Sequence, residues 1–296
     1  MRFSTHTMRS ISMPICMVVG VLLCYPITAF DKWSGELSTP FFIFSMLFCT
    51  FCRVDIREMK PSMLHLWLMV AQVVATFLVY YALRPLGDTV AQGGMICALT
   101  PMAMGAMVLA GMLGAKVETM ATHSLICNIA TAFIAPPLLS AWGNGTCTVV
   151  EILSRVTPLL ILPFVVAQLC RWILPKAAEK IGANSMLSFY LWLASLVIIM
   201  GKITCFVIDG GIENAITEII LAVVALVICL AQFGVGKWLG RNYGDTVAGA
   251  QALGQKNTLF AIWLSQSFLN PLACIAPTAY IVWQNLVNSY QIYKKR

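Results

Sequence analysis

Residues 245–260 read DTVAGAQALGQKNTLF and place a single lysine, Lys256, inside a long uncharged stretch. The nearest acidic residue in the sequence is Asp245. An ammonium in the middle of a membrane costs about 2.5–3.5 kcal/mol on insertion scales. Gly249, Gly254 and their polar neighbours also interrupt the apolar pattern. We therefore expect a helix that breaks here and a lysine that faces a cavity rather than lipid.

The composition of the whole chain is that of a membrane protein. Hydrophobic residues make up 59% and charged residues 10% of the 296 residues, and the mean hydropathy is +0.84. Too few polar side chains exist to cover a water-soluble surface. Uncharged runs long enough to cross a bilayer, which takes about 20 helical residues, recur along the chain. We predict an all-α polytopic membrane protein in the plasma membrane or an inner membrane.

Turn-forming residues and prolines divide the chain into ten predicted transmembrane helices. The last apolar run, for example, is too long for one crossing and is divided at Asn270-Pro271. The predicted segments lie near residues 10–30, 37–53, 61–83, 89–113, 119–141, 148–174, 184–207, 214–238, 245–268 and 271–292.

The distribution of lysine and arginine supports this count, because these residues gather in cytoplasmic loops. With a cytoplasmic N-terminus, fourteen of the 19 fall in loops and tails on the inner side, and the opposite loops hold only Lys32 and Arg84. Both termini are therefore predicted to be cytoplasmic. The inner residues are Arg2, Arg9, Arg53, Arg57, Lys60, Lys116, Arg171, Lys176, Lys180, Lys237, Arg241, Lys294, Lys295 and Arg296.

The first segment has a second interpretation. Arg2 and Arg9 precede the run SMPICMVVGVLLCYPITAF, which also resembles a secretory signal peptide. The length of this run favours a retained helix, and so does the need for five spans in each half.

Other function classes have little support in the sequence. The net charge of +7 is spread over loops on one side, as membrane orientation requires, so no nucleic-acid partner is expected. His6, His65 and His123 are scattered, and most of the 11 cysteines lie in apolar segments, where cysteine packs as a small hydrophobe. Because no metal or nucleophile motif is present, we expect no enzyme, metal or cofactor.

A second interrupted helix pairs with the one around Lys256. Residues 96–116, ICALTPMAMGAMVLAGMLGAK, carry Pro101 and Gly105 in mid-span. Interrupted helices at matching places in two halves indicate the binding site of a transporter. The two interrupted helices are the fourth and the ninth of the ten predicted segments, so each is the fourth segment of its half. Since each half has an odd number of spans, the two repeats, about 10–141 and 148–292, should be inverted.

Several stretches together resemble the bile acid:sodium symporter family. They are STPFFIFSMLFCTFCRVDIREMKP at 38–61, TPMAMGAMV at 100–108, HSLICNIATAFIAPPLL at 123–139, TVAGAQALGQKNTLFAIWL at 246–264 and NPLACIAPTAYIVWQNLVNS at 270–289. The resemblance covers nearly the whole chain. Gly254 with Asn257, Trp283 with Asn285, and Pro136 match family motifs.

This resemblance implies a single transporter domain, 1–296, with two parts. Helices 1, 2, 6 and 7 would form a panel, and helices 3–5 and 8–10 a core in which helices 4 and 9 unwind and cross. Members of the family carry organic anions, commonly with two sodium ions.

The chain departs from the family at several sodium-ligand positions. Ala106, Met107 and Ala252 stand where the family has a Ser-Asn pair and a glutamate, although Gln251 is adjacent to the last. Lys256 stands where the family has a glutamine. A sodium site needs several hard oxygen ligands, and the carboxylate is missing here.

Other family positions are kept. Ser124 and Asn128 retain oxygen atoms on one helix face, and Gln72 matches a sodium ligand in helix 3. We expect Lys256 to occupy the second sodium site and to donate to Gln72 and to carbonyls freed by the break. The lysine would replace the ion.

Together these features predict a secondary transporter for an organic anion, either bile-acid-like or a small carboxylate. Transport would be independent of sodium, with protons as a candidate coupling ion because burial favours the neutral form of a lysine. The alternatives are a sodium-coupled symporter and a membrane protein that binds a ligand without moving it. The expected substrate contacts are Asn257, Thr258, Gln284, Asn285 and Thr100.

Overall fold

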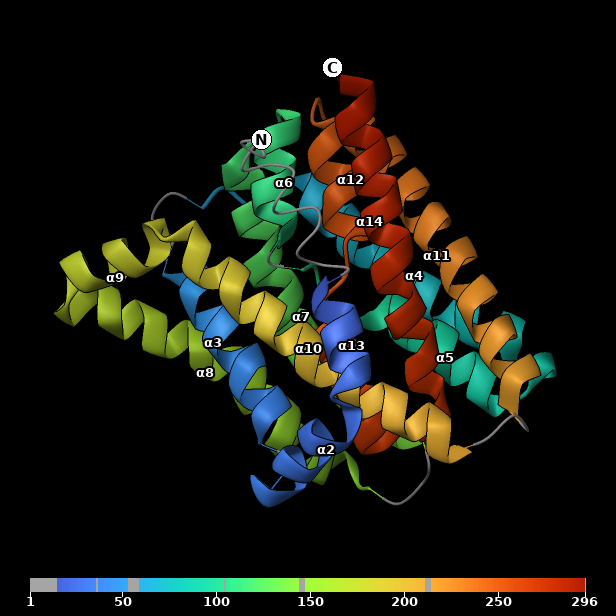
Figure 1. The fold of residues 1–296 in the computed structure, drawn as a ribbon. Coiled ribbons are helices and arrows are strands. Elements are labelled where there is room, and N and C mark those ends of the chain that lie inside the picture. The colour runs from blue at the N-terminus through green and yellow to red at the C-terminus, as the bar shows by residue number, and fades with distance from the viewer. Residues whose placement is uncertain are drawn as a thin grey trace, which may run out of the picture. The chain divides into compact units, whose positions relative to one another are not determined.

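The computed structural model of the chain describes residues 15–35, 37–52, 59–103, 105–143, 147–210 and 214–295. Helices and short turns make up these residues, which contain no β-strand (Figure 1). The predicted all-α class is confirmed. Some predicted features lie outside the described residues: the start of the first segment near residue 10, Arg2, Arg9, Arg53, Arg57 and Arg296.

The chain divides into two compact units. The first contains residues 1–53 and 162–214, and the second contains residues 54–161 and 215–296. Each unit is therefore assembled from two separate stretches of sequence.

The first unit is built from long helices and one short amphipathic helix. A helix at Ile15–Leu22 meets α2 at a bend of 76°. The buried carboxylate of Asp31, near the end of α2, pairs with Lys202 on α10 and accepts from Ser38 at the start of α3. The helices are α2 (Cys24–Trp33), α3 (Ser38–Phe51), the second part of α8 (Val149–Ile173), α9 (Pro175–Ala183) and α10 (Ser185–Gly210).

The second unit contains the same order of elements twice: a long helix, two half-helices separated by a break, and another long helix. The first series is α4 (Met63–Leu83), the 3-10 turn η2 (Arg84–Leu86), α5 (Asp88–Leu99), α6 (Gly105–Leu113) and α7 (Val117–Trp142). The second series is α11 (Ala215–Asn242), α12 (Thr246–Gly254), α13 (Thr258–Phe268), the 3-10 turn η4 (Pro271–Cys274) and α14 (Ile275–Lys295).

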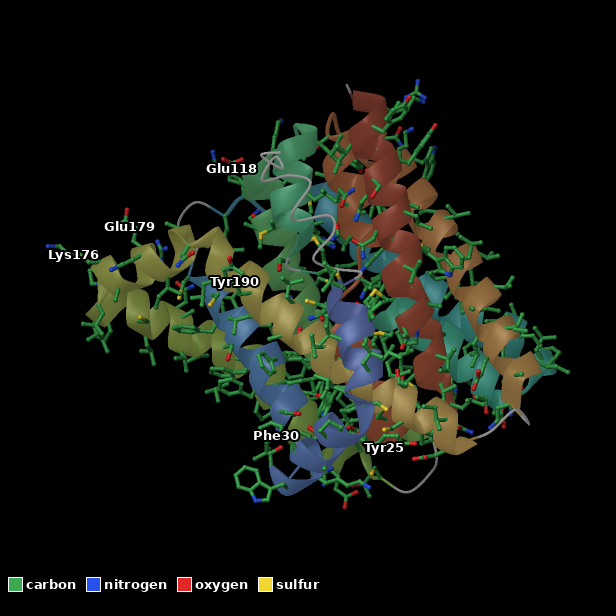
Figure 2. All side chains as sticks on the ribbon, in the orientation of Figure 1. Tyr25, Phe30, Glu118, Lys176, Glu179 and Tyr190 are labelled. Atoms are coloured by element: carbon green, nitrogen blue, oxygen red, sulfur yellow. The ribbon has the colours of Figure 1, made fainter. Side chains whose placement is uncertain are left out.

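Several helices are suited to a bilayer. Among the described residues, four are long and apolar enough to cross a membrane, or five if the bent pair at the start counts as one span. Each half-helix by itself is too short to cross a membrane. Exposed apolar side chains such as Tyr25 and Phe30 on α2 (Figure 2), and Leu66, Val70 and Val74 on α4, give these helices lipid-compatible surfaces. The chain is an integral membrane protein, and the ten crossings remain a prediction.

Close packing holds the half-helix α12 against α11. A side chain at Gly236 or Gly240 on α11, or at Gly249 on α12, would collide with the backbone of the facing helix. Glycine at these positions therefore allows the two backbones to touch.

Polar side chains anchor the ends of the broken helices. Asp245 caps α12 through Ala248 N–H at 3.0 Å, and its other oxygen accepts from Lys116 N–H between α6 and α7. At the start of α5, Gln92 accepts from Asn270 N–H at 2.8 Å. Asn270 also donates to Thr89 at 2.9 Å. In each series, residues at the start of the first half-helix thus bind the loop that follows the other broken helix.

Candidate functional site

The first break follows Leu99. Pro101 lacks an N–H and disfavours a helical conformation at the preceding residue, and Thr100 is extended, with ψ at 147°. The helix resumes at Gly105. The break leaves the last carbonyl groups of α5 without partners inside the helix.

The second break follows Gly254. Gln255 is extended, and α13 begins after Asn257, whose side-chain oxygen accepts from Phe260 N–H at 3.2 Å. A side chain at Gly254 would collide with the ring of Phe233 on α11. Asn257 therefore acts first as the N-cap of the second half-helix.

The two breaks lie against each other as a short antiparallel pair. Ala103 N–H donates to the carbonyl of Gln255, and Asn257 N–H donates to the carbonyl of Pro101, both at 2.8 Å. This pairing places Met102 opposite Lys256. Broken helices from the two series therefore meet at their unwound segments, within one compact unit.

Lys256 is buried at this crossing and is 1% exposed. Its ammonium donates to the carbonyls of Ala98 at 2.9 Å and Thr100 at 3.0 Å. Its backbone N–H donates to Gln284 Oε1 at 3.0 Å. The C-terminal end of a helix carries partial negative charge, so the position favours a cation.

The side chain of Gln72 has a different position from the one we expected. Its amide donates to the Leu99 carbonyl at 2.7 Å, and its oxygen accepts from the Cys127 thiol at 3.3 Å. Lys256 thus binds the carbonyls on either side of Leu99 rather than Gln72 itself. Gln72 and Lys256 therefore both donate hydrogen bonds to carbonyl groups at the C-terminal end of α5.

The predicted substrate contacts fall into two groups. Asn257, Thr258 and Gln284 are buried at the crossing, and Thr100 is there too, with its hydroxyl donating to Ile96. Asn285, one residue beyond Gln284 on α14, is half-buried and donates to Ile281 on its own helix at 2.6 Å.

The remaining predicted ion-site residues lie on two helices. On α7, the amide of Asn128 donates to the Ser124 carbonyl at 2.7 Å, and its side-chain oxygen has no hydrogen-bond partner among the described residues. On α12, Gln251 donates to Asn288 and Gln291 of α14. Gln251 therefore faces the last helix rather than the ammonium of Lys256.

An apolar cluster fills the space beside the breaks. Ala106, Met107 and Ala252 all belong to it, together with Met102 and Leu253. Their side chains offer no oxygen to a cation.

A model of the SBF-like CPA transporter family matches residues 12–286. The chain belongs to this family. The resemblance to bile acid:sodium symporters is confirmed at this level, and membership of this family indicates a membrane transporter. A search of the curated proteins finds no match to the chain.

The crossing of this transporter contains residues that our sequence reasoning missed. The Tyr280 hydroxyl lies 2.8 Å from the Gly254 carbonyl and 3.0 Å from Gln232 Oε1, and these two acceptors share its single proton. Gln232 in turn donates to the Cys97 carbonyl at 3.5 Å. The sequence did hold a signal for Gln232, because it is a polar residue within an apolar helix, and a buried amide in a membrane needs hydrogen-bond partners.

Proposed function

We propose that the protein is a secondary transporter that moves an organic anion without sodium coupling, and that Lys256 supplies the positive charge of a sodium ion. The observation that carries this proposal is the pair of hydrogen bonds from the Lys256 ammonium to the Ala98 and Thr100 carbonyls. A buried ammonium held by backbone oxygens in a broken helix does what a coordinated cation would do.

The lack of oxygen ligands supports sodium independence. By resemblance, Ala106, Met107 and Ala252 occupy sodium-ligand positions, and all three lie in the apolar cluster. Sodium binding needs several hard oxygen atoms, and a carboxylate strengthens it greatly. These positions provide neither.

Substrate would bind at the crossing, with its anionic group near the N-terminal ends of α6 and α13. Helix N-termini favour negative charge, and Lys256 would add attraction at the same break. Asn257, Thr258, Gln284, Asn285 and Thr100 are the proposed polar contacts. Several of these side chains already form hydrogen bonds with the backbone, so the substrate would either replace these bonds or add to them.

Alternating access would move a core against a panel. The second compact unit contains the crossing, and we assign it as the core. The first unit contains predicted panel helices 1, 2 and 7 and the second part of helix 6, whose first part, before residue 162, falls in the second unit. The repeated order of elements and the matching loop contacts of Asp245 and Asn270 support two inverted repeats, and the charge distribution supports cytoplasmic termini.

Protons are the proposed coupling ion. Burial away from carboxylates disfavours the charged form of Lys256, so a cavity that alternates between the two sides would let it release and regain a proton. A lysine that stays charged would instead permit only uniport or exchange.

A sodium symporter is the second candidate, favoured by one observation. Asn128 Oδ1 and Thr131 Oγ1 are buried on α7 without a hydrogen-bond partner in the described part of the chain. Two neutral oxygens could form part of a cation site, so sodium dependence has to be measured directly.

Uptake into proteoliposomes tests the proposal. Radiolabelled cholate, lactate and succinate cover bile-acid-like and small carboxylates. Choline replaces sodium in half the samples, and each condition is measured with and without a proton uncoupler. We expect uptake of at least one acid in choline buffer, driven by a pH gradient and lost with the uncoupler. A strict sodium requirement that ignores the uncoupler would defeat the proposal and favour the symporter.

A further inference from the structure

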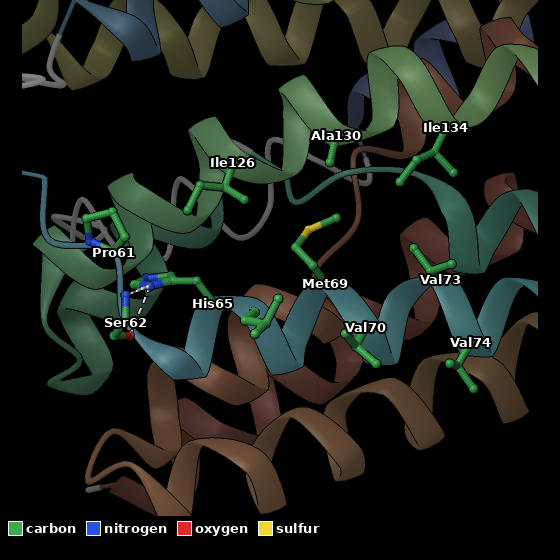
Figure 3. Close-up of a pocket in the computed structure, with 11 residues that line it drawn as sticks. Pro61, Ser62, His65, Met69, Val70, Val73, Val74, Ile126, Ala130 and Ile134 are labelled. Carbon is green, nitrogen blue, oxygen red and sulfur yellow. Dashed lines mark hydrogen bonds between the residues drawn. The ribbon is translucent and has the colours of Figure 1, made fainter.

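An apolar groove runs between α4 and α7, within one compact unit (Figure 3). Its volume is about 540 Å³. Val70 and Val74 of α4 line one wall, and Ala130 and Ile134 of α7 line the other. Val70 is 40% and Val74 48% exposed, so the groove is open along its length. Because lipid surrounds the helices of a membrane protein, acyl chains can enter this groove.

The length of the groove matches one leaflet of a bilayer. Along α4 it extends from Ser62 to Val74, which are 12 positions apart. At a rise of 1.5 Å per residue, this distance is about 18 Å. The hydrocarbon core of a bilayer is about 30 Å thick, so a chain in one leaflet spans about 15 Å. A single acyl chain can therefore occupy the groove from end to end.

Two helices begin at the polar end of the groove. His65 of α4 lines this end, and its Nε2 lies 3.1 Å from the carbonyl of Thr119 in the first turn of α7. The first N–H groups of a helix have no partners inside that helix, and no side chain caps α7. Both helix starts therefore carry partial positive charge at the same end of the groove.

The side chains at this end also favour an anion. Lys60, two residues before Ser62, and Lys116, the N-cap residue of α7, are exposed. Glu118 is exposed as well, whereas the carboxylate of Asp245 already accepts from two backbone N–H groups. In the described part of this region, two lysines and two helix N-termini are thus balanced by one free carboxylate. A phosphate group suits this distribution of charge.

We propose that the groove binds an acyl chain of an anionic phospholipid from the surrounding bilayer, with the phosphate at the shared start of α4 and α7. The apolar walls take the chain, and Lys60 with the free N–H groups takes the charge. A lipid bound in this way contacts both helices, so it stabilises the folded protein. The proposal does not depend on the transported substrate or on Lys256.

The test measures the melting temperature of the purified full-length protein in detergent during titration with lipid. The probes are dioleoylphosphatidylglycerol, dioleoylphosphatidylcholine, oleate and cholate. Val70→Trp fills the groove, and its matched control is Leu78→Trp, about two turns farther along α4 at a position that is 65% exposed and outside the groove. Lys60→Gln removes a charge at the polar end. Lys237→Gln, at an exposed position near the end of α11, is the control for charge.

We expect phosphatidylglycerol to raise the melting temperature at a lower concentration than phosphatidylcholine. Val70→Trp should need at least about tenfold more phosphatidylglycerol for the same rise, and Leu78→Trp should behave like the unmodified protein. Lys60→Gln should raise the required concentration about fivefold, as expected for one lysine near an anionic surface. Lys237→Gln should not change it.

Three results would overturn the proposal. The first is an equal response to phosphatidylglycerol and phosphatidylcholine, and the second is an equal response of Val70→Trp and Leu78→Trp. The third is stabilisation by oleate or cholate without stabilisation by phosphatidylglycerol, which would assign the groove to a different ligand. If Val70→Trp does not fold, the comparison of Lys60→Gln with Lys237→Gln decides, because both lysines are exposed.

Discussion

The two helix breaks have similar backbone geometry and opposite chemistry. The first, at 100–103, places Met102 at the centre of the pairing, and the second, at 255–257, places Lys256 there. Both follow a half-helix whose last carbonyl groups lose their partners inside the helix. The Lys256 side chain, in the second break, donates hydrogen bonds to the free carbonyl groups at the end of α5.

The carbonyls at the two breaks are satisfied differently. Those of Ala98 and Thr100 accept from an ammonium, whereas those of Gly254 and Gln255 accept from the neutral Tyr280 hydroxyl and Ala103 N–H. One half-helix end is therefore bound to a group that can gain or lose charge, and the other is not. If Lys256 releases its proton as proposed, its bonds to the Ala98 and Thr100 carbonyls lose their charge assistance, and the bonds at the second break do not change.

The largest effect is expected for Lys256→Met, which makes the second break as apolar as the first. Two buried carbonyls lose their donor, at a cost of about 1–3 kcal/mol each. We expect uptake to fall to background and the melting temperature to drop.

Lys256→Gln is the matched variant for this test. It keeps a donor and the family's residue type, so it should preserve more stability. Transport should be abolished or lose its pH dependence without gaining sodium coupling. If Lys256→Met shows normal uptake across the pH range, transport does not depend on the charge that distinguishes the second break from the first.

Gly254→Leu is expected to have the next largest effect. A side chain here meets the Phe233 ring, so the second break cannot keep its position. Uptake per inserted protein should fall more than the amount inserted. Pro101→Ala should cause a smaller loss, because Ala103 and Asn257 still pair the two breaks. Wild-type uptake in both variants would mean that the breaks are tolerated kinks without a role in binding.

Tyr280→Phe tests the neutral break. It removes the hydroxyl proton that the Gly254 carbonyl and Gln232 Oε1 share, at a cost of about 1–3 kcal/mol. We expect a lower melting temperature and a modest loss of uptake, with the same pH profile as the unmodified protein. A shifted profile would mean that both breaks respond to charge.

Asp245→Ala should have the smallest effect. It removes the cap of α12 and the bond to Lys116 N–H, far along α12 from the break. Loss of a cap costs about 0.5–2 kcal/mol. Melting temperature should fall slightly, and uptake should stay within a few-fold of the unmodified protein. A loss as large as that of Lys256→Met would indicate that the helix end, rather than the break, controls transport.

Much of this organisation could be predicted because it depends on local chemistry. Pro101 cannot continue a helix, and a lone lysine in an apolar stretch must find oxygen atoms, so an interrupted helix and a buried, bonded ammonium were reasonable expectations. The all-α class and the membrane setting followed from composition alone and are confirmed.

The partners of Lys256 could not be predicted from sequence. Backbone carbonyls belong to every residue, so no residue type marks Ala98 and Thr100 as acceptors, and we expected Gln72 to bind the ammonium directly. His65 and His123, 58 positions apart, read as scattered until α4 and α7 brought their rings together.

The sequence by itself determined most of the helical segments, the breaks at Pro101 and Gly254 and that Lys256 needs compensation, because these depend on backbone geometry and on the cost of charge in an apolar medium. It did not predict the 76° bend before α2 or the short helix α9. Only the tertiary structure decided that the two breaks pair and that the ammonium completes the end of α5. It also decided that Tyr280 with Gln232 joins both breaks. Each of these pairings joins residues distant along the chain, and their distances depend on how whole helices pack.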